Sequence, residues 1–132
     1  MTLPRGAISP HYLTPDAYNQ YIDDTGATYD DDTGFLVISL ENYSKLQSLL
    51  FVVDGNTFEL TANAQTWPHA LNSLIGGRDD GIYLVVGDIG YDIAGMDFIC
   101  GTAFMERFYI VLDTGSQQIS LATTQFTDAA TN

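Results

Sequence analysis

The chain contains the triplet Asp-Thr-Gly three times, starting at Asp24, Asp32 and Asp113. An aspartate at the end of an apolar strand, on a buried turn beside a second carboxylate, can share a proton with its partner and activate a water molecule. Asp24 follows a helix-like segment and Asp32 ends a run of three aspartates. We therefore predict a helix terminus at Asp24 and a solvated turn at Asp32, neither of which suits this chemistry.

Asp113 is the strongest candidate of the three. Residues 109–112 before it are apolar, and Ser116 extends the triplet to Asp-Thr-Gly-Ser. A second strand-like segment over 118–122 follows at once, however, and Asp and Gly are common turn residues. We therefore predict a hairpin turn here and no catalytic residue in the chain. Catalysis by two Asp113 residues paired across a homodimer is the less favoured alternative.

Short strands separated by turn residues make up most of the chain and would have to position any site. We predict strands over 35–40, 82–86 and 98–100, hairpins over 49–61 and 108–122, and helices over 14–23, 41–47, part of 62–74 and 102–107. This pattern indicates a mainly β fold with short helices. The predicted organisation is an irregular lead-in over 1–12, one domain over 13–126 and a frayed polar tail over 127–132.

The charge is strongly acidic, with 17 acidic against 4 basic residues and a net charge of -13 in 132 residues. This balance opposes binding to nucleic acid and to anionic membranes, and it suits a protein that works at low pH. No window holds the roughly 18 apolar residues of a membrane span, and no apolar signal segment is visible at the N-terminus. We expect neither nucleic acid nor a membrane as a partner.

Metal and cofactor signals are weak. His11 and His69 are the only histidines, and no Cys or Glu stands at metal-ligand spacing from them, so we expect no metal and no cofactor. Cys100 is the single cysteine and is predicted to be a buried thiol. Asn42 begins the sequence Asn-Tyr-Ser, which is a glycosylation site if the protein is secreted.

The segment from Phe98 to Asp113 resembles the C-terminal segment of the pepsin-like aspartic proteases of family A1. In that family a hydrophobic-hydrophobic-Gly strand, here Ile99, Cys100 and Gly101, leads into a short helix and a tyrosine-rich strand. Residues 50–60 resemble an internal hairpin of the same family, and 61–68 resemble its secreted fungal members. The resemblance covers 13–124 and implies a partial C-terminal lobe of the acid protease fold.

Two positions depart from the family pattern. Thr102 stands where an Asp usually follows the glycine, and the catalytic Asp-Thr-Gly should come just before the helix at Thr14. That place reads Arg-Gly-Ala-Ile-Ser-Pro-His-Tyr over 5–12. The resemblance thus implies one lobe of a secreted fungal endopeptidase that hydrolyses peptide bonds, with no catalytic aspartate of its own. We expect the isolated chain to be inactive.

The resemblance also implies partners and a cleft. The implied partners are an N-terminal protease lobe and a peptide substrate, and the implied cleft residues are Gly87, Asp88, Ile89, Asp97 and Ile99. Because loss of the catalytic strand would leave unpaired sheet edges, we expect a homodimer of the isolated chain. The alternative is a stand-alone, non-catalytic binding protein of lectin-like, immunomodulatory or inhibitor-like kind.

Overall fold

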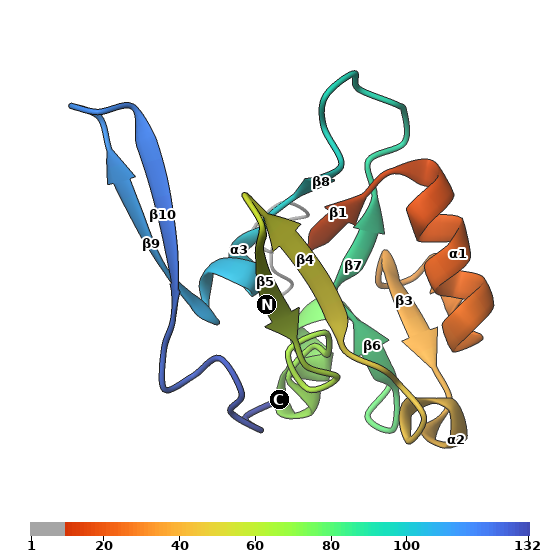
Figure 1. The fold of residues 1–132 in the computed structure, drawn as a ribbon. Helices are drawn as coiled ribbons and strands as arrows, with labels where there is room; N and C mark the ends of the chain where they lie inside the picture. The colour runs from red at the N-terminus through yellow and green to blue at the C-terminus, as the bar shows by residue number, and fades with distance from the viewer. Residues whose placement is uncertain (1–9) are drawn as a thin grey trace.

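A computed structural model describes residues 10–132 of the chain (Figure 1), which form short strands and small helices. The elements are β1 (His11–Leu13), α1 (Pro15–Thr25), β2 (Thr28–Asp30), β3 (Phe35–Ile38), α2 (Leu40–Tyr43), β4 (Leu49–Val53), β5 (Asn56–Leu60), the 3-10 helix η1 (His69–Ile75), β6 (Ile82–Leu84), β7 (Val86–Asp88), β8 (Phe98–Ile99), α3 (Thr102–Met105), β9 (Phe108–Asp113) and β10 (Gln118–Thr123). The strands of this part of the chain form small sheets in the orders β7-β1-β8, β2-β3-β6, β4-β5 and β9-β10. The predicted mainly β fold is confirmed.

Strand β1 corrects the prediction of an irregular lead-in over residues 1–12. His11 and Tyr12 belong to this strand, which pairs in parallel with β7 and antiparallel with β8. β1 is therefore the central strand of its sheet. Three residues are too few for a periodic pattern to show in the sequence. Residues 1–9 of the predicted lead-in lie outside the described residues.

The predicted strand over 82–86 is two strands. β6 pairs with β3 and β7 pairs with β1, and Val85 lies between them. The Val85 N–H donates to the Gln65 carbonyl, 2.8 Å away, and the His11 N–H donates to the Val85 carbonyl at 2.8 Å. The chain therefore changes sheets at Val85, and β7 includes Gly87 and Asp88, which lie beyond the predicted strand.

Helix α1 follows its sequence signals closely. Thr14 is its N-cap residue, Pro15 occupies its first turn and Gly26 ends it with φ of 67°. The Gly26 N–H donates to the Ile22 carbonyl over 2.8 Å, and only glycine adopts this backbone conformation without strain. Tyr18 and Tyr21, three residues apart on α1, are both buried. The helices α2 and α3 are shorter than predicted, at four residues each.

Both predicted hairpins are present. Asp54 and Gly55 form the two-residue turn between β4 and β5, and both have positive φ, as a type I′ turn requires. The hairpin of β9 and β10 projects from the body of the molecule at the left of Figure 1. At its outer end Leu112 and Ile119 are paired across the strands and are 69% and 71% exposed.

The main core lies where α1, β1, β4, β7 and α3 meet. It contains the side chains of Tyr21, Leu13, Phe51, Val86 and Phe104, all buried. Phe104 stacks on Phe108 with ring centroids 4.4 Å apart and meets Phe51 edge-on at 5.6 Å. A second, smaller cluster packs around Trp67, Tyr83 and Val85.

The C-terminal tail, which we predicted to be frayed, is hydrogen-bonded to the body of the molecule. Thr127 is buried, and its hydroxyl donates to the Arg107 carbonyl at 2.6 Å. The backbone N–H groups of Thr131 and Asn132 donate to the Asn63 side-chain oxygen at 3.0 and 3.1 Å. The Asn132 amide also donates to the Thr66 carbonyl at 2.8 Å. The tail is polar, but its polar groups are satisfied by the body of the molecule.

Candidate functional site

The structure brings the predicted cleft residues together on the sheet of β7, β1 and β8. Gly87 and Ile99 flank Tyr12 on the two neighbouring strands. A side chain at Gly87 would meet the Tyr12 ring, because a Cβ there would lie 3.0 Å from the nearest ring carbon. The absence of a side chain therefore lets the Tyr12 ring pack across β7. Ile99 is 40% exposed, so it is not a core residue.

The other three predicted cleft residues lie at the ends of the segment joining β7 and β8. Asp88 is exposed and pairs with Leu13, and its carboxylate accepts from the Gly90 N–H at 2.8 Å. The Ile89 N–H donates to the Leu13 carbonyl at 2.9 Å. Asp97 is exposed just before β8. The five residues thus gather around the carboxyl end of β1.

The motif of Ile99, Cys100 and Gly101 leads from β8 into α3. Gly101 is buried, and its carbonyl accepts from the N–H groups of Phe104 and Met105 at 3.0 and 3.1 Å. Cys100 is half-buried against the main core, and this burial raises the pKa of its thiol. The thiol is therefore a packing group, less enclosed than we predicted.

The three Asp-Thr-Gly triplets lie where the sequence predicts. Asp24 is in the last turn of α1, and Asp32 lies in the exposed turn between β2 and β3. Asp113 ends β9 at the outer end of the projecting hairpin. Its carboxylate accepts hydrogen bonds from the Ser116 hydroxyl and from the N–H groups of Ser116 and Gly115, and these bonds lower its pKa. The carboxylate is exposed, and both of its oxygens accept hydrogen bonds from within its own turn.

Asn42, the predicted glycosylation site, lies in α2, and its side chain lies next to the end of α1. It is half-buried, its N–H donates to the Ser39 hydroxyl at 3.2 Å, and its side-chain nitrogen lies against Gly26. A Cβ at Gly26 would come within 2.5 Å of this nitrogen. The close approach of Asn42 is therefore a second reason for glycine at the end of α1, because it leaves no space for a Cβ. Glycosylation at Asn42 stays a prediction.

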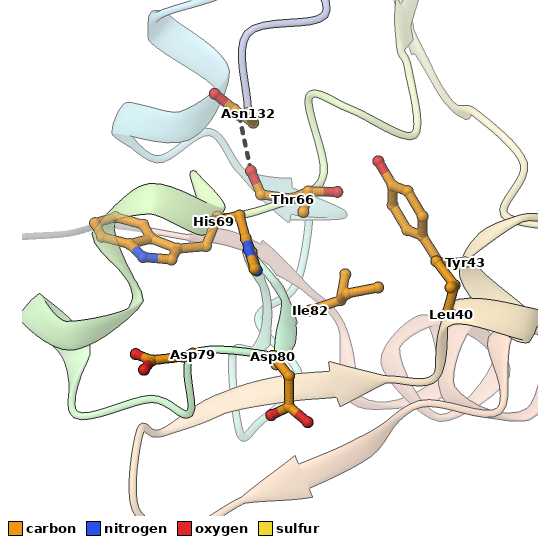
Figure 2. A pocket seen from close by; sticks show the side chains of 10 residues that line it. Leu40, Tyr43, Thr66, His69, Asp79, Asp80, Ile82 and Asn132 are labelled. Carbon is orange, nitrogen blue, oxygen red and sulfur yellow. Dashed lines mark hydrogen bonds between the residues drawn. The ribbon is translucent and has the colours of Figure 1, made fainter.

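A hollow of about 660 Å³ lies apart from the predicted cleft residues, none of which line it. Figure 2 shows Tyr43, Ile82, His69 and Asp80 arranged around this hollow. Its walls are mainly apolar, with Asp79 and Asp80 at the loop before β6. The arrangement lacks a hydrogen-bonded nucleophile and base among the contacts of its lining residues, so it offers space for binding but no evident catalysis.

Among residues 10–132 no group of three His, Cys, Asp or Glu side chains is placed to hold a metal ion. Within the same residues, no helix has the length and apolar character needed to cross a membrane.

Two buried polar residues were missed by the sequence reasoning. His11 is 1% exposed, between the rings of Phe51 and Phe104 at 6.0 and 5.6 Å, and neither of its ring nitrogens has a hydrogen-bond partner among residues 10–132. Burial lowers its pKa to about 4. Arg107 is 4% exposed and donates to the carbonyls of Phe126 and Ala129. No local sequence signal marks either position.

Comparison with solved structures defines the class of protein. The chain matches the crystal structure of an aspartic proteinase from Irpex lacteus with a TM-score of 0.89 and 49% sequence identity. The match covers 93% of this chain and 36% of the solved chain. The fold is therefore that of part of an aspartic proteinase.

Sequence comparison gives the family. The model of the eukaryotic aspartyl protease family matches residues 8–124, and the chain belongs to that family. It is 50% identical to polyporopepsin of the fungus Irpex lacteus over 121 residues, which are 91% of this chain and 36% of the relative. It is 26% identical to pepsin A of Gallus gallus over 106 residues, which are 80% of this chain and 25% of that protein. The chain thus spans about a third or less of these relatives, and the predicted resemblance is confirmed.

Proposed function

We propose that the chain forms most of the C-terminal lobe of a secreted aspartic endopeptidase and that, by itself, it does not hydrolyse peptides. The family assignment supports the first part. The positions of Asp32 and Asp113 support the second, because both of these Asp-Thr-Gly triplets follow strands but lie on exposed turns. In the two-lobed protein, two carboxylates activate a water molecule for attack on the peptide carbonyl. This chain contributes one wall of the cleft and the core that packs behind that wall.

The proposed partners are an N-terminal lobe, which supplies a catalytic carboxylate, and a peptide substrate. The cleft wall that this chain offers is the β7-β1-β8 sheet, with Gly87, Asp88 and Ile99 on its outer strands. The segment over 5–12 contains no acidic residue. We propose that the catalytic Asp-Thr-Gly of this lobe is not among these residues.

We expect no peptide cleavage by the purified chain between about pH 2 and pH 5, the range in which a catalytic pair of carboxylates shares one proton. A fluorogenic peptide library should show only the background rate, and Asp113→Asn should leave that rate unchanged. Circular dichroism at each pH would verify that the chain is folded. Cleavage that pepstatin inhibits and that Asp113→Asn abolishes would contradict the proposal and would favour a homodimer with two Asp113 residues at its site.

We also propose that the isolated chain forms a homodimer through the β9–β10 hairpin. Leu112 and Ile119 lie side by side on one face of this hairpin and are largely exposed, and such edges and faces pair readily with other chains. Light scattering at neutral pH should give a mass that rises with concentration. Leu112→Lys with Ile119→Lys should restore the monomer mass. A monomer mass at every concentration would contradict this proposal.

A further inference from the structure

The outer edge of strand β4 is free. Among the described residues β4 pairs only with β5, in a hairpin whose two-residue turn follows Val53. In such a hairpin the residues next to the turn are hydrogen-bonded to each other, and the pattern alternates along the strands. The N–H and C=O groups of Leu50 and Val52 therefore point away from β5. Their side chains are 63% and 64% exposed.

A groove of about 450 Å³ runs beside this edge, between β4 and helix α1. The buried side chains of Leu13 and Phe51 and the partly buried Phe98 provide apolar surface in it. The full lining is formed by Leu13, Ala17, Gln20, Tyr21, Asp24, Leu49, Leu50, Phe51, Val52, Asp97 and Phe98. An unpaired strand edge beside an apolar groove is the arrangement that accepts an added strand, with backbone hydrogen bonds on one side and side-chain pockets on the other.

The charge of the groove indicates what kind of segment it accepts. Asp24 and Asp97 line it, and no Lys, Arg or His is among its lining residues. A segment with basic side chains would be attracted by these carboxylates and by the net charge of -13. A second copy of the chain would instead bring the same carboxylates toward one another. The observations thus favour a basic segment over a self-pairing of β4.

We propose that the outer edge of β4 and the adjoining groove bind an extended peptide that alternates apolar and basic residues, by strand addition. The site goes beyond the proposed protease function. Only one of the predicted cleft residues, Asp97, lines it. At about 3.3 Å per residue, six residues extend for about 20 Å, enough to pass the exposed length of β4.

The test uses a fluorescein-labelled hexapeptide of alternating lysine and valine, followed by fluorescence anisotropy at low salt. We expect saturable binding that weakens about tenfold with Val52→Lys, since the added charge and bulk lie at the edge. Thr57→Lys is the matched control, because Thr57 is the exposed partner of Val52 on β5 and receives the same charge away from the groove. It should weaken binding about twofold or less. Near-UV circular dichroism would verify that both variants fold.

Two further peptides separate strand addition from other modes of binding. A hexapeptide N-methylated at alternate residues should lose binding, because it cannot form the edge hydrogen bonds, and a glutamate–valine hexapeptide should not bind. Equal binding of the methylated peptide, or equal weakening by Val52→Lys and Thr57→Lys, would overturn the proposal. So would light scattering that shows a dimer converted to a monomer by Val52→Lys, since a second copy would then occupy the edge.

Discussion

Replacing His11 with leucine is expected to make folding much less sensitive to acid. His11 is buried with both ring nitrogens unpartnered, and burial lowers its pKa from 6.5 to about 4. Between these two values the unfolded chain binds a proton that the folded chain does not. The free energy of unfolding therefore falls as the pH falls from about 6.5 to about 4, by about 3 kcal/mol from this residue alone, and levels off below about pH 4.

Urea unfolding at a series of pH values measures this effect. His11→Leu should lose the part of the pH dependence that lies between about pH 4 and pH 6.5, and it should be as stable as the parent or more stable at pH 7, since an unsatisfied polar ring is removed from the core. His69→Leu is the matched control, because it removes an exposed histidine and keeps His11 in place. A His11→Leu profile parallel to that of the parent would rule out this role for the buried imidazole.

The expected loss of stability in acid contrasts with the acidic composition of the chain, which suits a protein that works at low pH. In an acidic solution, protonation of His11 would favour unfolding of the isolated chain. Protonation of the many carboxylates would at the same time reduce their mutual repulsion. The first effect acts at one site in the core, and the second is spread over the surface. The pH at which the chain is most stable should therefore lie well above its isoelectric point of about 4.1.

Arg107→Met should lower the free energy of unfolding by about 3 kcal/mol, because several buried hydrogen bonds are lost at once. The guanidinium donates to the carbonyls of Phe126 and Ala129 and, over 3.2 Å, to the Asn63 side-chain oxygen. Its charge has no carboxylate at ion-pair distance among residues 10–132. Burial lowers the pKa of Arg107, and the neighbouring Glu106 opposes this shift.

The measurement is urea unfolding together with amide hydrogen exchange of residues 126–132. Arg107→Met should speed exchange in the tail as well as lower stability, and Arg107→Lys should have an intermediate effect, since a single ammonium cannot reach all three acceptors. Arg78→Met is the control, because Arg78 is exposed and its contact with Asp80 at 3.7 Å lies at the surface. Unchanged exchange in the tail of Arg107→Met would show that other contacts hold it.

Structural features that are determined by a few neighbouring residues were predictable from the sequence. The Asp-Gly turn after Val53, the proline and glycine at the two ends of α1 and the hairpin turn at Asp113 each depend on a few neighbouring residues. For the same reason the hairpin at Asp113 was predictable, since a second strand follows it directly.

Features that depend on distant parts of the chain were not predictable. β1 is a strand because it lies between β7 and β8, and its three residues carry no pattern of their own. The burial of His11 follows from that placement, as does the inclusion of Gly87 and Asp88 in a strand. The tail was expected to fray because it is polar, yet its partner Asn63 is 69 residues away in the sequence. The candidate cleft was placed by resemblance, and only the sheet showed that its residues lie together.

The attachment of the tail to Asn63 also bears on the order in which the chain folds. This contact closes a loop of 69 residues, so the chain loses much conformational freedom before the bonds at Asn63 can form. The strands of the β4–β5 hairpin are joined by only two residues, so closing this hairpin costs much less conformational freedom. During synthesis, Asn132 would leave the ribosome after its acceptors were already in place. The tail should therefore be the last segment to dock and the first to open, while the hairpins and α1 remain native.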